Sequence, residues 1–387
     1  MDQLIQSGKY KNWSEIAPMV NHELFGDDES LYRDESAYRK ACKYARDFYD
    51  AGVFTSEDKY MQELTIQKRE LAKLKNQIQT EKLEYNKWLR EEARDELIAE
   101  KICNTISTLP PITSPEYIEP VRTNESYLLA IADPHYGIEF SIKDLFGNII
   151  NEYSPEIFEQ RMWLLFHKLI QIIKRENIRE LSIWELGDGI NGILRLNSQL
   201  MKLRYGIIDS SILYANFLAN WLNALSEYVR IKFQMVIDSN HCQLRICNAP
   251  KNAFPEENMS KSMLVLIKER LKNNPNIVFI DNPTGMNYGL MSTYSVLGIH
   301  GEVKSTGSNV VDEFARTYQT HIDYLIMGHA HHKISEENGI DSECLVCRSI
   351  IGVDPYSMSL RRTSNPGATL FHFAQGEGLV TQHSIKL

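Results

Sequence analysis

The sequence predicts an α/β protein in which a mixed α/β domain follows an α-helical N-terminal region with a long helix. From about residue 123 onward, short apolar and β-branched runs alternate with amphipathic helical stretches. Before this part, residues 57–104 are rich in Glu, Lys, Gln and Leu and contain neither Pro nor Gly. Between the two lies a segment with four prolines in twelve positions, residues 109–120. We therefore expect two or three modules.

Residues 1–56 predict a small helical domain. Asn12 is a candidate N-cap for a first helix, and residues 36–49 form a second helical stretch after a break at residues 26–30. The second stretch carries four bases: Arg39, Lys40, Lys43 and Arg46. The pattern suits either a DNA-binding helix-turn-helix or a small helical bundle whose exposed face holds these bases. Acidic residues outnumber basic ones over residues 1–120, which favours the bundle.

Residues 57–104 predict a long helix or coiled-coil arm. Apolar residues recur every seven positions at Leu64, Leu71, Ile78 and Tyr85, with Leu74 and Trp88 on the companion position of the same seam. Gln67 and Glu81 interrupt this seam. We expect the helix to pair with another helix, either of the same chain or of a second copy in a homodimer.

Residues 105–122 predict a Pro-rich linker, because proline cannot continue the helix. Residues 123–387 then predict the mixed α/β domain. Its runs are nearly continuous in apolar residues, as in strands of a sheet that is covered on both faces.

Charge and composition exclude several classes of protein. The formal net charge of -9 gives no overall basic field, so any contact with nucleic acid is local. No apolar run is long enough to cross a membrane and the start of the chain is polar, so we expect a cytoplasmic protein without a membrane partner. Six scattered cysteines predict reduced thiols. Cys344 and Cys347 form a CxxC that suggests zinc, but they lie in a predicted strand that sends them to opposite faces.

Five apolar runs each end in residues that bind metal ions. The motifs are Asp133-Pro134-His135, Gly187-Asp188, Asn240-His241, His300, and Gly328-His329-Ala330-His331. Polar residues at the carboxyl ends of strands are where α/β sheets place their sites. One such residue is usually a turn former, but five motifs after five strands predict a common site. Carboxylate, imidazole and amide ligands favour two divalent transition metal ions, with Mn expected and Fe or Zn as alternatives.

The order DxH, GD, NH, H, GHxH resembles the calcineurin-like metallophosphoesterase superfamily, whose pattern is DxH, GD, GNH(D/E), H, GHxH. The resemblance covers residues 123–387. It implies two facing mixed sheets flanked by helices, a four-layer αββα sandwich. The helical extension is similar to that of proteins carried by phages of low-GC bacteria, so the expected setting is a phage-infected or prophage-bearing bacterium. A repair-nuclease-like branch of the superfamily also combines helices with such a site.

The resemblance implies a role for each motif residue. One metal is held by Asp133, His135 and His331, a second by Asn240, His300 and His329, and both by a bridging Asp188. His241 is the implied catalytic residue, which stabilises charge on the phosphorus or protonates the leaving oxygen. The chain departs from the family pattern here, because Ser239 replaces the Gly and Cys242 replaces the acid that supports the histidine. Asp238 replaces that acid only if the turn places its carboxylate next to the imidazole of His241.

The expected function is a metal-dependent phosphoesterase, most specifically a phosphodiesterase or nuclease that cleaves DNA by attack of metal-activated water. The residues after Asp188 lack the arginine of many phosphomonoesterases, which favours diesters. One alternative is a phosphodiesterase for small nucleotides or a phosphomonoesterase whose helical arm serves dimerisation. Another is a metal-bound scaffold without activity. His332 either lines the substrate groove or is a solvated loop residue.

Overall fold

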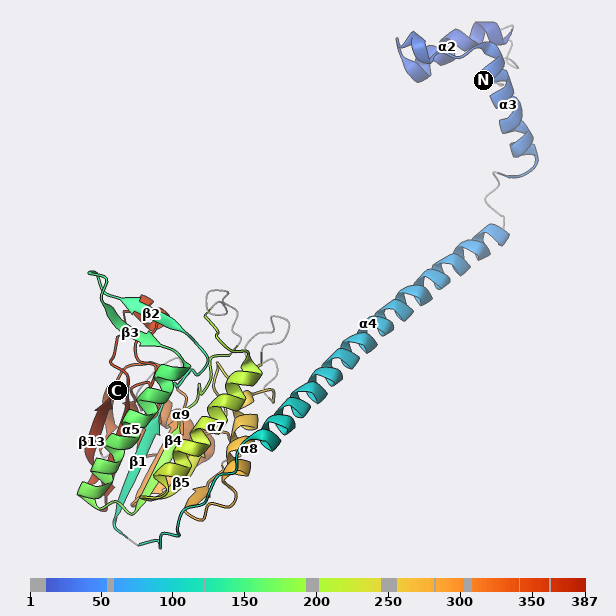
Figure 1. Ribbon diagram of the computed structural model, residues 1–387. Coiled ribbons are helices and arrows are strands. Elements are labelled where there is room, and N and C mark those ends of the chain that lie inside the picture. The colour runs from blue at the N-terminus through green and yellow to red at the C-terminus, as the bar shows by residue number, and fades with distance from the viewer. Residues whose placement is uncertain are drawn as a thin grey trace. The chain divides into compact units, whose positions relative to one another are not determined.

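The computed structural model describes residues 12–53, 59–121, 123–192, 202–244, 256–281, 283–302, 308–340, 342–361 and 363–387 (Figure 1). The chain divides into two compact units, Met1–Asp95 and Glu96–Leu387. The predicted domain limits near residues 56, 104 and 122 stay predictions.

The first unit begins with a helical pair. Helix α2 (Trp13–Phe25) has Asn12 as its N-cap, a 3-10 helix η1 (Glu29–Leu31) follows, and α3 (Glu35–Asp50) is capped by Asp34. The buried amide of Asn21 joins the pair: it donates to the carbonyl of Arg33 and accepts from the backbone N–H of Arg33, each at 2.9 Å. These bonds fix the turn between the helices.

Helix α4 runs from Lys59 to Thr108, four residues past the limit expected from the sequence. It ends before Leu109 and Pro110, because a residue that precedes proline is disfavoured in the helical conformation. Its heptad positions are open to solvent: Leu71 is 71% exposed, and Leu74, Ile78 and Tyr85 are also exposed. Lone apolar side chains on a surface are ordinary, whereas a stripe of them at heptad spacing is typical of coiled-coil helices, and the pairing of α4 with another helix stays a prediction.

The Pro-rich segment is docked along the second unit through side-chain hydrogen bonds. The buried amide of Asn276 donates to the carbonyl of Glu116 at 2.6 Å and accepts from the N–H of Ile118 at 2.8 Å. Asn223 and Arg270 donate to the carbonyls of Thr113 and Pro110. The segment is extended, as expected from the sequence, and it is held in place rather than free.

The larger sheet of the second unit has six strands in the order β13-β12-β1-β4-β5-β6. Strands β1 (Glu125–Ile131), β4 (Glu180–Glu185), β5 (Arg230–Met235) and β6 (Ile277–Phe279) are parallel neighbours. Strands β12 (Gly367–Ala374) and β13 (Gly378–Lys386) extend the sheet in antiparallel pairing. The long crossovers between the parallel strands contain helices α5 (Pro155–Glu176), α7 (Ile207–Leu225) and α8 (Met259–Leu271).

The smaller sheet has five strands in the order β10-β11-β9-β8-β7. Strands β8 (Tyr294–Ile299), β9 (Tyr324–Met327) and β11 (Ser342–Val346) are parallel, and β7 (Asn287–Met291) and β10 (Ile334–Gly339) are antiparallel edges. Helix α9 (Ser308–Tyr318) connects β8 to β9, and the short α10 (Pro355–Ser359) precedes β12. A separate hairpin pairs β2 (Phe140–Lys143) with β3 (Ile149–Tyr153).

Three apolar clusters show how the layers pack. Along β1, Leu129 and Ile131 face a cluster that includes α5, α7 and α8, whereas Leu128 and Ala130 face a cluster shared with the smaller sheet. The outer face of the smaller sheet packs on α9 through a third cluster, which includes Leu325 and Val310. The order of layers is therefore helices, sheet, sheet, helix, which confirms the predicted αββα sandwich of two mixed sheets (Figure 1).

Two further features bear on the sequence analysis. Cys344 and Cys347 are buried in different apolar clusters, as strand alternation predicts, and Cys247 lies outside the described residues. Over the described part of the chain, no helix combines the length and the apolar character that a membrane span requires.

Candidate dinuclear metal centre

The predicted site residues all follow strands that run parallel to a neighbour. Asp133 and His135 follow β1, Asp188 follows β4, Asn240 and His241 follow β5, His300 follows β8, and His329 and His331 follow β9. Parallel strands present their carboxyl ends at the same edge of a sheet. The structure accordingly brings all eight side chains together where the two sheets face each other.

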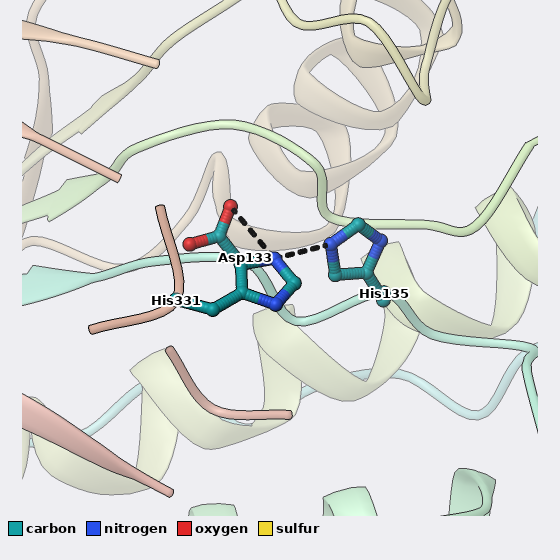
Figure 2. Close-up of side chains that lie close together, drawn as sticks. All are labelled: Asp133, His135 and His331. Carbon is teal, nitrogen blue, oxygen red and sulfur yellow. Dashed lines mark hydrogen bonds and ion pairs between the residues drawn. The ribbon is translucent and has the colours of Figure 1, made fainter. Parts of the chain in front are cut away.

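One cluster comprises Asp133, His135 and His331 (Figure 2). The two imidazoles approach with their Nε2 atoms 3.2 Å apart, and Nε2 of His331 lies 3.9 Å from Oδ1 of Asp133. Two nitrogens bound tetrahedrally to one ion at about 2.0 Å lie about 3.3 Å apart. The observed spacing of the imidazoles is thus that of two ligands of a single ion.

A second cluster comprises His300, His329 and Asn240. Nε2 of His300 lies 3.2 Å from Nδ1 of His329 and 3.1 Å from Oδ1 of Asn240. Asp188 lies between the clusters, because its Oδ2 is 3.0 Å from Nε2 of His300 and 3.9 Å from Nε2 of His135. One carboxylate oxygen therefore faces both ligand sets, as a bridging ligand must.

A backbone N–H group holds one oxygen of each carboxylate. Oδ1 of Asp133 accepts from the N–H of His329 at 3.0 Å, and Oδ1 of Asp188 accepts from the N–H of His241 at 2.9 Å. Oδ2 of Asp133 is buried and has no hydrogen-bond partner among the described residues. A buried oxygen without a partner is rare in proteins. Together with the spacing of the nitrogens, it shows that these residues fit two divalent ions.

Asp188 and His300 form the charged pair of the site. Burial acts to raise the pKa of Asp188, but the imidazoles of His300 and His241 outweigh it and hold the pKa well below its usual range. Burial likewise acts to lower the pKa of His300, and Asp188 outweighs it and raises the pKa to about 10. Because an imidazole binds metal only when neutral, loading of this ligand set releases the proton of His300.

Other imidazoles of the site are already neutral. Burial lowers the pKa of His329 to about 4, aided by the neighbouring charge of His300. Burial and His241 together hold the pKa of His135 well below its usual range. These two ligands need no deprotonation before they bind an ion.

Among the described residues, no acid accepts a hydrogen bond from Nδ1 of His241. Its Nε2 lies 3.9 Å from Oδ2 of Asp188, but its buried Nδ1 has no hydrogen-bond partner among the described residues. Asp238 is exposed and accepts from Gln243 instead, and burial raises the pKa of the Cys242 thiol to about 12. Burial lowers the pKa of His241 below its ordinary value, with His300 and His331 acting in the same direction. The turn therefore does not place the carboxylate of Asp238 at the imidazole of His241. With its pKa lowered, His241 is a neutral imidazole.

Ser239, which replaces the glycine of the family pattern, has a specific contact. Its hydroxyl accepts from the N–H of Asp188 at 3.0 Å, and the side chain is fully buried. Gly187 is required at the same place: its φ is +89°, and a Cβ would lie 2.7 Å from that of Ser239 and 2.9 Å from Nδ1 of His300. The packing between these two turns fixes the position of Asp188.

Two carboxylates that no sequence motif indicated lie next to the ligands. Oδ1 of Asp354 lies 3.6 Å from Nδ1 of His331, on the side of the ring opposite to the ligand nitrogen. Glu185 is fully buried beneath Asp188, and its carboxyl group accepts from the N–H of Gly187 at 3.0 Å and from the hydroxyl of Tyr214 at 3.3 Å. Neither residue belongs to a metal-ligand motif. The only local signal was the Asp-Pro pair that begins α10.

Known proteins resemble different parts of this chain. Residues 67–109 match a family model described as the YonJ coiled-coil domain. The SPbeta prophage-derived uncharacterized protein YonJ of Bacillus subtilis is 28% identical over 386 residues, which is 96% of this chain and 91% of that protein. Among solved structures, a dimetal phosphatase from Danio rerio has a TM-score of 0.34 at 12% identity and covers 67% of this chain and 98% of its own. Vps29 of Entamoeba histolytica, complexed with zinc, has a TM-score of 0.30 at 11% identity and also covers 67% and 98%.

The two facing mixed sheets and the motif residues gathered at one edge are the arrangement that the resemblance noted in the sequence implied. The prophage relative agrees with the phage type of that resemblance. The coiled-coil match agrees with the heptad spacing in α4.

Proposed function

We propose that this chain is a dinuclear metal-dependent phosphodiesterase that hydrolyses the backbone of DNA. The observation that carries the proposal is the position of Asp188, whose Oδ2 faces His300 at 3.0 Å and His135 at 3.9 Å. Two divalent ions in such a site supply a water of lowered pKa and neutralise charge on the phosphate. Mn is the proposed metal, with Fe and Zn as alternatives.

The residues of the chain hold and orient the reacting groups. Asp133 and Asp188 each keep one oxygen on a backbone N–H, and Oδ2 of Asp188 faces imidazoles of both ligand sets. His241 stands beside Asp188, and as a neutral imidazole it stabilises the transition state by donating a hydrogen bond to a phosphate oxygen. Protonation of the leaving group then falls to water, because no described acid supports a charged His241.

The choice of DNA rests on charge and setting. Arg39, Lys40 and Lys43 are exposed on α3, where they are available to a polyanion. The prophage relative supports a role close to DNA. A small nucleotide or a phosphomonoester is the competing substrate. A scaffold without activity ranks below both, because all seven ligand positions hold competent residues.

The proposed partner of the helical arm is a second copy of this chain. With Leu64, Leu71, Ile78 and Tyr85 at position a, the flanking e positions hold Lys68, Lys75 and Lys82, and the g positions hold Glu70, Gln77 and Glu84. In a parallel pair g faces e of the partner, so Glu70 meets Lys75, whereas an antiparallel pair places lysine opposite lysine. We therefore propose a parallel homodimer.

The test is hydrolysis of bis-p-nitrophenyl phosphate, single-stranded DNA, double-stranded DNA, cyclic nucleotides and phosphomonoesters by the full chain with Mn. We expect cleavage of the diesters, with DNA favoured over cyclic nucleotides. Asp188→Ala is expected to lose both activity and bound metal. Asp323→Asn is a control at the opposite end of β9, where Asp323 accepts from the N–H of Ser295, and it should retain both. Activity that persists in Asp188→Ala at an undiminished rate would refute the proposal.

A further inference from the structure

A cavity of about 560 Å³ lies beside the His331 end of the candidate centre. His332 lines it directly after the ligand His331, and Val353 lines it directly before Asp354. The other walls come from Ile150 and Asn151 of β3, from Lys333 and Arg348, and from residues 363–366. The cavity therefore lies close to His331 and Asp354, and His332 is one of its lining residues.

Two cations in this cavity have no acidic partner. Among the described residues, neither Arg348 nor Lys333 has a carboxylate within ion-pair distance. The guanidinium of Arg348 is held by neutral groups: Nε donates to the hydroxyl of Ser384 and Nη1 to that of Ser364, each at 2.8 Å. Among the residues that the structure describes, Nη2 of Arg348 donates no hydrogen bond. In a protein with 51 acidic and 42 basic residues, a fixed and unpaired guanidinium indicates a site for an anion.

The cavity beside the other ligand cluster is lined by two carboxylates. A second cavity, of about 300 Å³, is lined by the ligand His300 together with Asp238 and Glu302. A phosphate is repelled from these carboxylates and attracted to Arg348 and Lys333. When one phosphate of a polyanion occupies the metal centre, the next phosphate therefore extends toward the cavity beside His331.

The hairpin that forms one wall of the basic cavity also carries an exposed aromatic ring. Leu145 is 99% exposed and Phe146 88% exposed at its tip. The tip is well ordered, because Oδ1 of Asp144 accepts from the N–H groups of Phe146 and Asn148, each at 2.8 Å. At its base, Asn151 donates to the carbonyl of Ile351 beside the cavity. An exposed aromatic ring on the hairpin that lines the cavity offers a surface on which a base of a single strand can stack.

We propose that the basic cavity is a subsite for a second backbone phosphate of a single-stranded nucleic acid, bound by Arg348 and Lys333, with a base stacked on Phe146. This inference rests on the proposed function and specifies its substrate. It predicts a preference for strands that extend beyond the scissile phosphate on one side, over diesters that carry a single phosphate.

The test measures binding of a labelled single-stranded oligonucleotide to the full chain in EDTA, by fluorescence anisotropy over a range of salt concentrations. We expect Arg348→Gln and Lys333→Gln each to weaken binding about tenfold at low salt and to reduce the slope of log K against log salt by about 0.7. Phe146→Ala is expected to weaken binding without a change in slope. Arg179→Gln, an exposed arginine just before β4, should leave both quantities unchanged.

The outcomes separate this inference from the proposed function. If the slope of log K against log salt is unchanged in both Arg348→Gln and Lys333→Gln, the proposed subsite is wrong, whether or not the chain hydrolyses diesters. Displacement of the strand by an equal concentration of inorganic phosphate also overturns it, because the cavity then binds a free ion rather than a strand. Failure of the wild-type chain to hydrolyse any diester with Mn refutes the proposed function alone. Because Lys333 is exposed, its variant remains informative if Arg348→Gln does not fold.

Discussion

Five residues of the candidate centre have left-handed backbone conformations. The φ values are +50° for Asp133, +45° for His135, +52° for Asp188, +63° for His329 and +55° for His331. Such residues cost on the order of 1–3 kcal/mol each and persist only where the surroundings enforce them. Asp and His tolerate this region better than most residues. The same residue types therefore serve both the tight turns after the strands and the ligand chemistry.

Asp354 is expected to act through His331 as a positioning residue. It is the N-cap of α10, where its Oδ1 accepts from the N–H of Ser357 at 2.7 Å. Asp354→Asn keeps a good cap and removes the charge that faces His331. We expect metal affinity to fall about 10- to 100-fold, as measured by calorimetric titration.

Asp34 provides the matched control for this substitution. It caps α3 in the same way, with its Oδ1 accepting from the N–H of Ala37 at 2.8 Å, and it belongs to the first unit. Asp34→Asn should leave metal affinity at the wild-type value. An equal loss of affinity in both variants would assign the effect to capping.

Glu185 makes stability depend on pH. Burial raises its pKa to about 8, whereas an unfolded chain releases this proton above about pH 4.3. Since the folded state binds the proton more tightly, each pH unit between these values lowers the free energy of unfolding by roughly 1.4 kcal/mol, and the loss levels off above pH 8. Glu185→Gln is expected to flatten this decline, measured by urea unfolding of the metal-free protein from pH 5 to 9.

Glu180→Gln, on the same strand, is the control. Its carboxylate is half-buried and pairs with Lys232, so the substitution should keep the wild-type dependence of stability on pH. A decline in Glu185→Gln as steep as in the wild type would show that another group is responsible.

At the scale of elements, α4 makes the clearest prediction. Leu71 and Ile78 lie one heptad apart on the exposed apolar stripe, and Leu83 is 70% exposed but lies off that stripe. We expect the wild-type chain to be a dimer by light scattering, and Leu71→Asp with Ile78→Asp to be a monomer, because the seam buries both side chains. A disulfide or cross-link between equivalent positions in the two copies would report the parallel arrangement.

Leu83→Asp changes an apolar residue of α4 to the same acid outside the seam and should remain dimeric. The dimer proposal is refuted if the wild type is monomeric at micromolar concentration. It is also refuted if Leu83→Asp dissociates as readily as the double variant.

At the scale of the whole molecule, metal binding is expected to stabilise the second unit selectively. All eight site residues belong to Glu96–Leu387. Ions at 100 times their Kd stabilise the folded state by about 2.7 kcal/mol per site. Calorimetry of the full chain should show that Mn raises the unfolding temperature of this unit only, and that EDTA reverses this increase. The shift should be absent in Asp188→Asn, and a shift of equal size there would place the ions elsewhere.

Much of the fold was predictable because its signals are local. Apolar runs such as residues 127–132 identify a strand, and the polar residue after each run marks where the strand ends. The heptads of residues 64–85 identify a helix in the same way. The extended Pro-rich segment was predictable, but its docking was not, because Asn276 lies some 160 positions beyond the carbonyl and N–H groups that it binds.

The sequence by itself determined the succession of strands along the chain, the long helix and the set of metal-binding residue types. Hydrophobic periodicity and short motifs depend only on residues that are close together in the sequence. Only the tertiary structure decided that Asp354 supports His331, that Asp238 does not support His241, and that Arg348 and Lys333 share a cavity. Those relations join residues from different strands and loops. Their distances follow from how the two sheets pack and where each loop returns, which no local pattern encodes.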